Sequence, residues 1–334
     1  MSEAAGPTAG PTAGHTARDR TWLGRHPGPV LAAGALGVSG SAVLIDLSRT
    51  SPGTASFYRC LLALPLLAPL VALERRRSGV LSRRLHLFAM AAGVLFAGDM
   101  LLWTQAIAEV GAGLSTVLVN LQVVFVPLLA WLVDRERVTS RFLVVLPLLL
   151  VGVALTAGVV DGGAAGSRPV AGAVHAGLAA LCYSGYLFLL RRGGHGGPVI
   201  AAYGDVIATA AVVSLVLGAV WHGVDLSPGW TAIGWLALVS VCGQVIGWLL
   251  VALASPRLPS HIGAILLLFT PVGAVALGAL VLHERPTAAQ LLGCVLILGC
   301  GYFASRGRGE DVRKAREDRA GADVDPGGSS SFRR

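Results

Sequence analysis

The chain has 334 residues, of which 54% are hydrophobic and 13% are charged, with a formal net charge of +8 and a mean hydropathy of +0.71. A soluble globular domain spreads its charges over its surface, whereas here most charges fall in clusters between long uncharged runs. These features exclude an ordinary soluble enzyme, and the absence of a separate basic domain argues against a nucleic-acid partner. They predict an all-α polytopic membrane protein.

The apolar runs have the length of about 17–25 residues that a helix needs to cross a bilayer. Ten runs are predicted to be transmembrane helices: 29–47, 54–73, 86–107, 112–133, 141–158, 171–190, 198–220, 231–253, 260–282 and 288–304. Residues 1–28 form a low-complexity tail that is expected to be disordered, because it cannot bury a core. Residues 305–334 form a second, charged tail.

Short patterns recur in the two halves of the chain at nearly equal separations. The matching sets are Glu136-Arg137-Val138-Thr139 with Glu284-Arg285-Pro286-Thr287, Gly98-Asp99 and Trp103 with Gly243-Gln244 and Trp248, and Pro52, Phe57 and Arg59 with Pro198, Tyr203 and Asp205. The agreement predicts an internal duplication into two five-helix repeats, 29–158 and 171–304. Because five is an odd number, the second repeat would start from the opposite side of the membrane, so the two repeats are expected to be inverted.

Loop charges predict the orientation. Almost all Lys and Arg residues outside the spans fall on the side that also holds both tails, and the exceptions in the opposite loops are Arg49, Arg168 and Arg285. By the positive-inside rule, both termini are cytoplasmic. The predicted location is the plasma membrane, and a composition rich in Arg, Ala and Gly suggests a bacterial inner membrane.

Arg59, Asp99 and Asp205 lie away from the ends of their predicted spans, where burial of a charge is costly and a functional role is the default hypothesis. Asp99 and Asp205 are candidates for binding a proton or a cationic group, and Arg59 is a candidate for steering an anionic group or gating the outer mouth. In inverted repeats, Asp205 is the counterpart of Arg59 and Gln244 that of Asp99, and such positions converge on the central axis. The alternative for each residue is a structural ion pair or hydrogen bond.

Polar and aromatic residues complete a predicted substrate-binding site. Its candidate residues are Arg59, Asp99, Trp103, Asn120, Tyr183, Asp205, Gln244 and Trp248. Pro127 and Pro271 are predicted to bend the fourth and ninth spans. The sequence contains no Walker loop, no GxSxG motif and no HExxH motif, so we predict no catalytic residue, no metal site and no cofactor.

Two stretches resemble a known family. SPGTASFYRCLLALPLL, from Ser51, is similar to the second-helix signature of the EamA-type transporters of the drug/metabolite transporter superfamily, and TPVGAVALGALVLHERPTAAQLLGCVLILGCGYF, from Thr270, resembles their ninth-to-tenth-helix signature. The residues at matching motif positions are Arg59, Glu136, Pro271 and Glu284. One departure is Val123, which stands where the first repeat should carry the equivalent of Pro271. The resemblance implies ten helices in two inverted repeats, a central cavity, alternating access and export of small metabolites.

The predicted function is a secondary transporter that exports a small polar or amphipathic metabolite, such as an amino acid, an amino-acid derivative or a drug-like compound. Asp99 and Asp205 are the candidates for proton coupling. Two alternatives stay open: a passive facilitator or channel, and a membrane sensor that binds a ligand without moving it. The expected partners are the small-molecule substrate, the lipid bilayer and protons, with no nucleic acid, and the protein is expected to be a monomer or a homodimer.

Overall fold

The computed structural model describes residues 26–135, 140–156, 168–193, 198–254, 266–267, 269–300 and 302–303. Within these residues the chain forms helices and no strand, as predicted. Glu136 and almost all of the two predicted tails lie outside the described residues, and so do the side chains of Val123 and Pro127.

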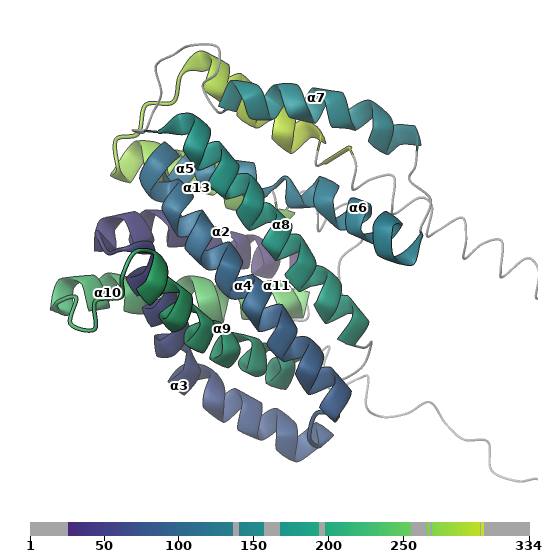
Figure 1. Ribbon diagram of the computed structural model, residues 1–334, viewed down its shortest axis with the longest axis vertical. Coiled ribbons are helices and arrows are strands. Elements are labelled where there is room, and N and C mark those ends of the chain that lie inside the picture. The colour runs from purple at the N-terminus through teal and green to yellow at the C-terminus, as the bar shows by residue number, and fades with distance from the viewer. Residues whose placement is uncertain are drawn as a thin grey trace, which may run out of the picture.

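The helices are shown in chain order in Figure 1. The first half of the chain contains α2 (Pro27–Ser48), α3 (Pro52–Ser78), α4 (Arg83–Val110), α5 (Ala112–Val119), α6 (Gln122–Asp134) and α7 (Ser140–Thr156). The second half contains α8 (Pro169–Gly193), α9 (Val199–Trp221), α10 (Trp230–Leu238), the π-helix η2 (Val239–Gly247), α11 (Trp248–Ala254), α13 (Phe269–Val281) and an unlabelled last helix, Ala288–Cys300.

Seven helical segments within the described residues are long and apolar enough to cross a membrane. They correspond to the first four predicted spans and to the sixth, seventh and eighth. The fifth, ninth and tenth predicted spans correspond to the shorter apolar helices Leu146–Thr156, Phe269–Val281 and Ala288–Cys300. The structure therefore confirms an all-helical chain with several membrane-spanning helices, and the count of ten spans stays a prediction.

Local sequence explains where α3 and α4 begin. Pro52 occupies the first turn of α3, where its missing N–H breaks no hydrogen bond, and the Ser51 side chain accepts from the N–H of Thr54 at 3.2 Å. Ser82 caps α4 in the same way through the N–H of Leu85 at 3.3 Å. These caps fix the ends of the two helices that carry the buried charges.

The fourth and eighth spans are not regular α-helices. The fourth is divided into α5 and α6 by a tight turn at Asn120 and Leu121, where the Asn120 side chain donates to the carbonyl of Thr116 at 2.9 Å. This interruption precedes Pro127, so it is not the proline bend that the sequence predicts. The eighth span passes from α10 into η2 and then α11. Pro271 is buried in α13, and the bend predicted there stays a prediction.

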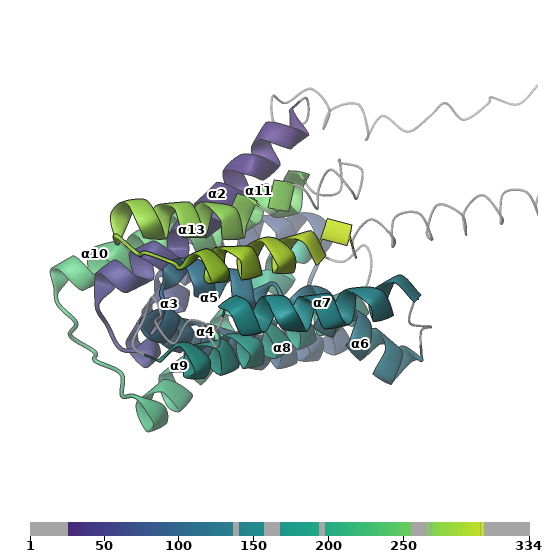
Figure 2. The same cartoon turned by 90° about the horizontal axis from the view of Figure 1, so that it is seen from above.

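Glycines allow the two halves to pack closely. An added Cβ would lie 2.9 Å from the carbonyl oxygen of Gly247 at Gly34, and 3.0 Å from that of Cys242 at Gly37, so α2 packs directly on the backbone of η2. At one end of the long axis, α7 lies beside the last helix in both views (Figures 1 and 2), and Gly152 faces Gly293 there. Without a hydrophobic drive between helices in lipid, such close contacts hold a membrane protein together.

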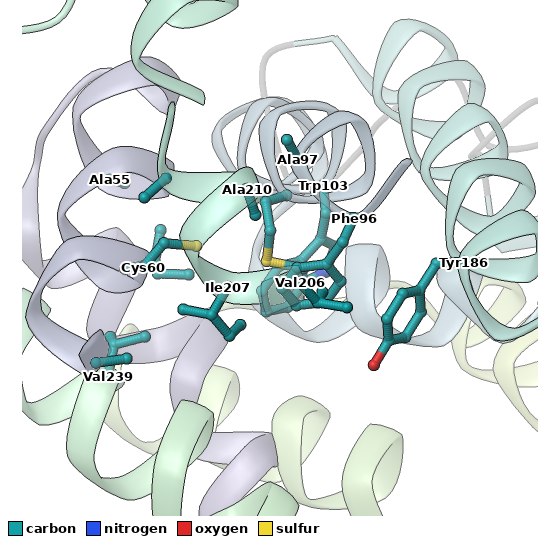
Figure 3. Close-up of a cluster of buried hydrophobic side chains, with 14 of the residues drawn as sticks. Ala55, Cys60, Phe96, Ala97, Trp103, Tyr186, Val206, Ile207, Ala210 and Val239 are labelled. Atoms are coloured by element: carbon teal, nitrogen blue, oxygen red, sulfur yellow. The ribbon is translucent and has the colours of Figure 1, made fainter. Parts of the chain in front are cut away.

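The largest buried cluster lies where α3, α4, α8, α9 and η2 meet. Its side chains include Phe96 and Trp103 from α4, Val206 from α9 and Tyr186 from α8 (Figure 3). This cluster surrounds the buried polar residues described next.

Candidate functional site

Arg59 is a buried cation with a neutral partner. It lies on α3 with 3% of its surface exposed, and its Nη2 donates to Oε1 of Gln244 at 2.8 Å. Its Nε and Nη1 have no hydrogen-bond partner among the described residues. A buried charge is costly unless its donors are satisfied, so the unused N–H groups mark a place where an acceptor would bind strongly.

Gln244 is held in place by Tyr203. The Gln244 amide donates to the Tyr203 hydroxyl at 3.0 Å, and that hydroxyl donates to the backbone carbonyl of Gln244 at 3.0 Å. Ser240, also on η2, donates from its hydroxyl to the backbone carbonyl of Arg59 at 2.9 Å. The π-helix therefore joins α3 and α9 at the level of the buried guanidinium, and π-helical turns are frequent at functional sites.

Asp99 and Trp103 lie one turn apart on α4. Asp99 is 2% exposed and within Coulombic range of Arg59, and its Oδ1 has no hydrogen-bond partner in the described part of the chain. The Arg59 Cζ lies 5.5 Å from the centroid of the Trp103 ring, in the range of a cation–π interaction. One face of α4 thus presents an acceptor and an aromatic ring to the cation.

Aromatic rings extend from this group. Tyr183 and Tyr186 of α8 have ring centroids 5.5 Å apart, and Tyr183 lies 6.2 Å from Trp248 of α11. We call the set Arg59, Asp99, Trp103, Tyr183, Tyr203, Gln244 and Trp248 the Arg59 cluster. It draws on helices from both halves of the chain and combines a donor, an acceptor and flat apolar surfaces.

The structure brings together six of the eight predicted substrate-binding residues in the Arg59 cluster. The two that lie elsewhere are Asn120, at the turn between α5 and α6, and Asp205. The sequence analysis noted Tyr203 only as the counterpart of Phe57 and did not assign it to the site. The available signal was its position two residues before Asp205, in the same matching set.

Asp205 is held by cationic and imidazole groups at the ends of α3 and α4. Its carboxylate accepts from Arg75 at 3.2 Å and contacts Nδ1 of His86 at 2.7 Å. Arg75 follows Arg59 by about 24 Å along α3, at 1.5 Å per residue. Beside this group, Glu74 accepts from the N–H of Ala201 at 2.7 Å. The prediction that Asp205 lies near Arg59 at the central axis is therefore wrong.

The opposite end of α3 is fastened to the linker after α9. The Ser51 hydroxyl donates to the Gly223 carbonyl at 2.9 Å, and the Tyr58 hydroxyl donates to the Leu226 carbonyl at 2.7 Å. A polar cavity of about 470 Å³ lies here between residues 48–54 and 222–228. The α3–α9 pair is thus tied at both ends, with the Arg59 cluster between them.

A buried carboxylate that the sequence analysis did not single out lies at the end of α4. Glu109 is 4% exposed, accepts from Nε2 of Gln105 at 2.8 Å and contacts Nδ1 of His175 at 2.6 Å. The pair joins α4 to α8. No group of three or more His, Cys, Asp or Glu residues that could hold a metal ion occurs in the described ranges.

Tyr203→Phe is expected to lower the apparent melting temperature in detergent by roughly 2–8 °C, because it leaves the Gln244 amide and carbonyl buried and unpaired. Tyr58→Phe is the matched control, since its hydroxyl bonds to an exposed carbonyl and should shift the melting temperature less. Thermal unfolding followed by tryptophan fluorescence measures both variants. Equal shifts would contradict the bridging role of Tyr203.

Comparisons with known proteins identify a family and a similar fold. The family model of the EamA-like transporter family matches residues 28–158 and 170–305. No curated protein matches the chain. One solved crystal structure is similar with a TM-score of 0.53 and 18% identity, over 84% of this chain and 96% of the other, which supports the fold alone.

The two matched ranges cover most of the chain, so the protein belongs to the EamA-like transporter family. It is a multi-pass membrane protein built from two copies of the family's repeat, and its class is that of membrane transporters in the drug/metabolite transporter superfamily. The resemblance found in the sequence is confirmed.

Proposed function

We propose that the protein is a secondary transporter that exports a small polar or amphipathic metabolite across the plasma membrane by alternating access. The observation that carries the proposal is the buried guanidinium of Arg59, whose single hydrogen-bond partner among the described residues is the neutral amide of Gln244. A purely structural arginine would be expected to have its donors satisfied by carboxylates or carbonyls.

The chemistry of the Arg59 cluster favours a cargo with two unlike ends. An acidic group would bind the unused N–H groups of Arg59, and a basic or hydrogen-bond-donating group would bind Oδ1 of Asp99. A flat or apolar portion would pack on the rings of Trp103, Tyr183 and Trp248. Amino acids and their derivatives have this combination.

Helix packing supports an inverted relation between the repeats. The third span, α4, packs on the sixth, α8, and the exchanged pair is also present, because the eighth span packs on the first through η2 and α2. The pairs α3 with α9 and α5 with α13 each join equivalent spans of the two repeats. A two-fold axis generates such exchanged pairs, and the odd number of spans predicted in each repeat would place that axis in the membrane plane, where transporters of this kind have their sites.

Transport and its alternatives are separated by flux measurements. The purified protein in proteoliposomes is tested with a panel of labelled amino acids, amino-acid derivatives and nucleobases, in both directions. A transporter shows saturable flux and counterflow exchange. A channel shows flux without counterflow exchange, and a sensor shows ligand-induced stabilisation without flux.

Asp99→Asn and Asp205→Asn are expected to differ. Asp99→Asn removes the buried carboxylate of the cluster, so proton-driven accumulation should be lost and cargo affinity should fall by about tenfold or more. Asp205→Asn should leave affinity within about twofold, because distant sites are nearly additive and Asp205 contacts Arg75 and His86 instead. Binding is measured by thermal-shift titration and accumulation under an imposed pH gradient. Full, still pH-dependent flux in both variants would refute the proton role.

A further inference from the structure

Glu284 reaches back from the second repeat to the first. It lies in the linker after α13, where the N–H groups of Leu282 and Glu284 both donate to the Gly278 carbonyl, at 3.0 and 3.1 Å. Between them His283 has a positive φ of 56°. This reversal of the chain places the Glu284 side chain against the start of α5.

The Glu284 carboxylate caps α5 with both oxygens. Oε1 accepts from the N–H of Ala112 at 2.6 Å, and Oε2 accepts from the N–H of Gly113 at 3.1 Å. These are the first two residues of α5, whose N–H groups have no partner within the helix. The positive end of the helix dipole adds to the attraction.

Three glycines make room for this carboxylate. A Cβ added at Gly111 would lie 2.7 Å from Oε1 and one at Gly113 would lie 3.1 Å from Oε2, while one at Gly278 would collide with Oε2. Gly111 also has a φ of +93°, which side chains rarely adopt. Backbone from both repeats therefore closes around one carboxylate.

The helix that Glu284 caps, α5, is short and packs between the two repeats. α5 has 8 residues, starts just after Gly111 and ends at the turn at Asn120. Its residues from Ala112 to Leu118 are buried, and Gly113 packs so closely on α13 that a Cβ there would lie 2.9 Å from the Cα of Val275. A short, interrupted helix between two repeats is the kind of element that can change position in a transport cycle.

The surroundings of Glu284 are nearly free of other charges. α5 and α13 contain no ionisable side chain, and Glu109 at the end of α4 is paired with His175. Its sequence neighbours His283 and Arg285 are exposed. The described charged group whose field reaches Glu284 is Asp46 on α2.

Burial raises the pKa of Glu284, and the negative charge of Asp46 raises it further, while the two backbone N–H groups of α5 oppose the shift. A carboxyl whose pKa is raised in the closed arrangement favours that arrangement when protonated. The stability it contributes is therefore present at acid pH and is lost as pH rises from the ordinary glutamate value through the raised one.

We propose that Glu284 is a positioning residue of the transport cycle: its carboxyl joins the N-terminal end of α5, in the first repeat, to the α13 linker of the second. We call this contact between the Glu284 carboxyl and the start of α5 the Glu284 clasp. While the clasp is closed, the two repeats are fixed to each other at the predicted outer face. When it opens, α5 and α13 are free to separate. The clasp acts at a distance from the Arg59 cluster and does not depend on the identity of the cargo.

The test compares Glu284→Ala, Glu284→Gln and the control Arg285→Gln in the purified full-length protein. Glu284→Ala removes both acceptors, so its melting temperature should fall by about 2–8 °C at acid pH and by less as pH rises. Glu284→Gln cannot titrate and resembles the protonated carboxyl, so the melting temperature of wild type relative to this variant should fall as pH rises from 4.5 to 8. Arg285→Gln should follow the wild-type profile.

A wild-type melting temperature in Glu284→Ala would overturn the clasp, and a pH-independent difference between wild type and Glu284→Gln would overturn its link to protons. These readouts need no transport, so they stand even if the proposed function fails. The role in the cycle does rest on that function. With a compound from the flux panel, Glu284→Ala should lower counterflow exchange while affinity stays within about twofold. Unchanged exchange would overturn the positioning role.

Discussion

Arg59→Gln is expected to lower cargo affinity by about 100-fold and to abolish measurable transport. The substitution removes the Nε and Nη1 donors that have no partner in the described chain and cancels the buried positive charge. Charge-assisted bidentate bonds of arginine to a carboxylate are among the strongest polar contacts in proteins, at about 1.5–3 kcal/mol for each hydrogen bond to a charged group. Thermal-shift titration and proteoliposome flux with the transported compound measure the loss.

The melting temperature of Arg59→Gln should not fall as its cargo affinity does. A buried charge with unpaired donors carries a desolvation cost that a neutral glutamine does not, so the melting temperature of Arg59→Gln should equal or exceed that of wild type. Arg59→Lys keeps the charge but not the planar fork, and should recover only part of the affinity. Arg76→Gln, at an exposed position in the last turn of α3, is the control. A large drop in stability with unchanged affinity would make Arg59 a structural residue and refute the site.

Gly53→Ala is expected to give a large loss of stability for a change of a single methyl group. A Cβ at Gly53 would lie 2.7 Å from the carbonyl oxygen of Gly223 and 2.9 Å from the Cα of Gly218. Both neighbours are backbone, so α3 and α9 must move apart. Overpacking of this kind costs about 1–3 kcal/mol, which corresponds to a fall in melting temperature of roughly 2–10 °C.

The matched control for this substitution is Gly234→Ala on α10, because a Cβ there meets nothing within 4 Å. Alanine favours helix more than glycine does, so the control should be neutral or slightly stabilising. Fluorescence-detected size-exclusion chromatography after heating compares the two variants. If Gly53→Ala survives heating as well as the control, the close contact between α3 and α9 is not required for the fold.

The helical architecture and much of the site were predictable because burial of charge in lipid is costly and leaves a clear pattern. Arg59 and Asp99 interrupt long apolar runs, and the matching sets of the two halves identify Gln244 as a counterpart of Asp99. The direct bond between Arg59 and Gln244 then follows from the meeting of α3 with η2. Tyr203 was harder to find, because a tyrosine at a span start is common and its two bonds to Gln244 depend on the shape of the π-helix.

Asp205 was misplaced because the predicted spans were too short. α3 continues to Ser78 instead of stopping at 73, and α4 starts at Arg83 instead of 86. The extension of α3 brings Arg75 within reach of the carboxylate, beside His86 in the first turn of α4. A hydropathy pattern ends where charges begin, whereas a helix can continue into the membrane surface on the strength of its own backbone bonds.

The break between α5 and α6 and the π-helical stretch also lay beyond prediction from the sequence. Neither is caused by a proline: Pro127 follows the break, and no proline occurs in η2. Each belongs to an element that packs against the other repeat, α5 on α13 through Gly113 and η2 on α2 through Gly243 and Ser41. Such features depend on the assembled tertiary structure, which local propensity does not contain.

The π-helical turns of η2 determine how many residues this part of the chain needs. A π-turn closes over one residue more than an α-turn, so the run Val239–Gly247 accommodates more residues per turn than a regular helix would. Deleting one residue there would let the segment relax to α-helical winding while Trp230 and Trp248 keep their places. The Gln244 side chain would then rotate away from Arg59. Deleting one residue from this stretch should therefore leave membrane insertion and folding intact but abolish cargo binding.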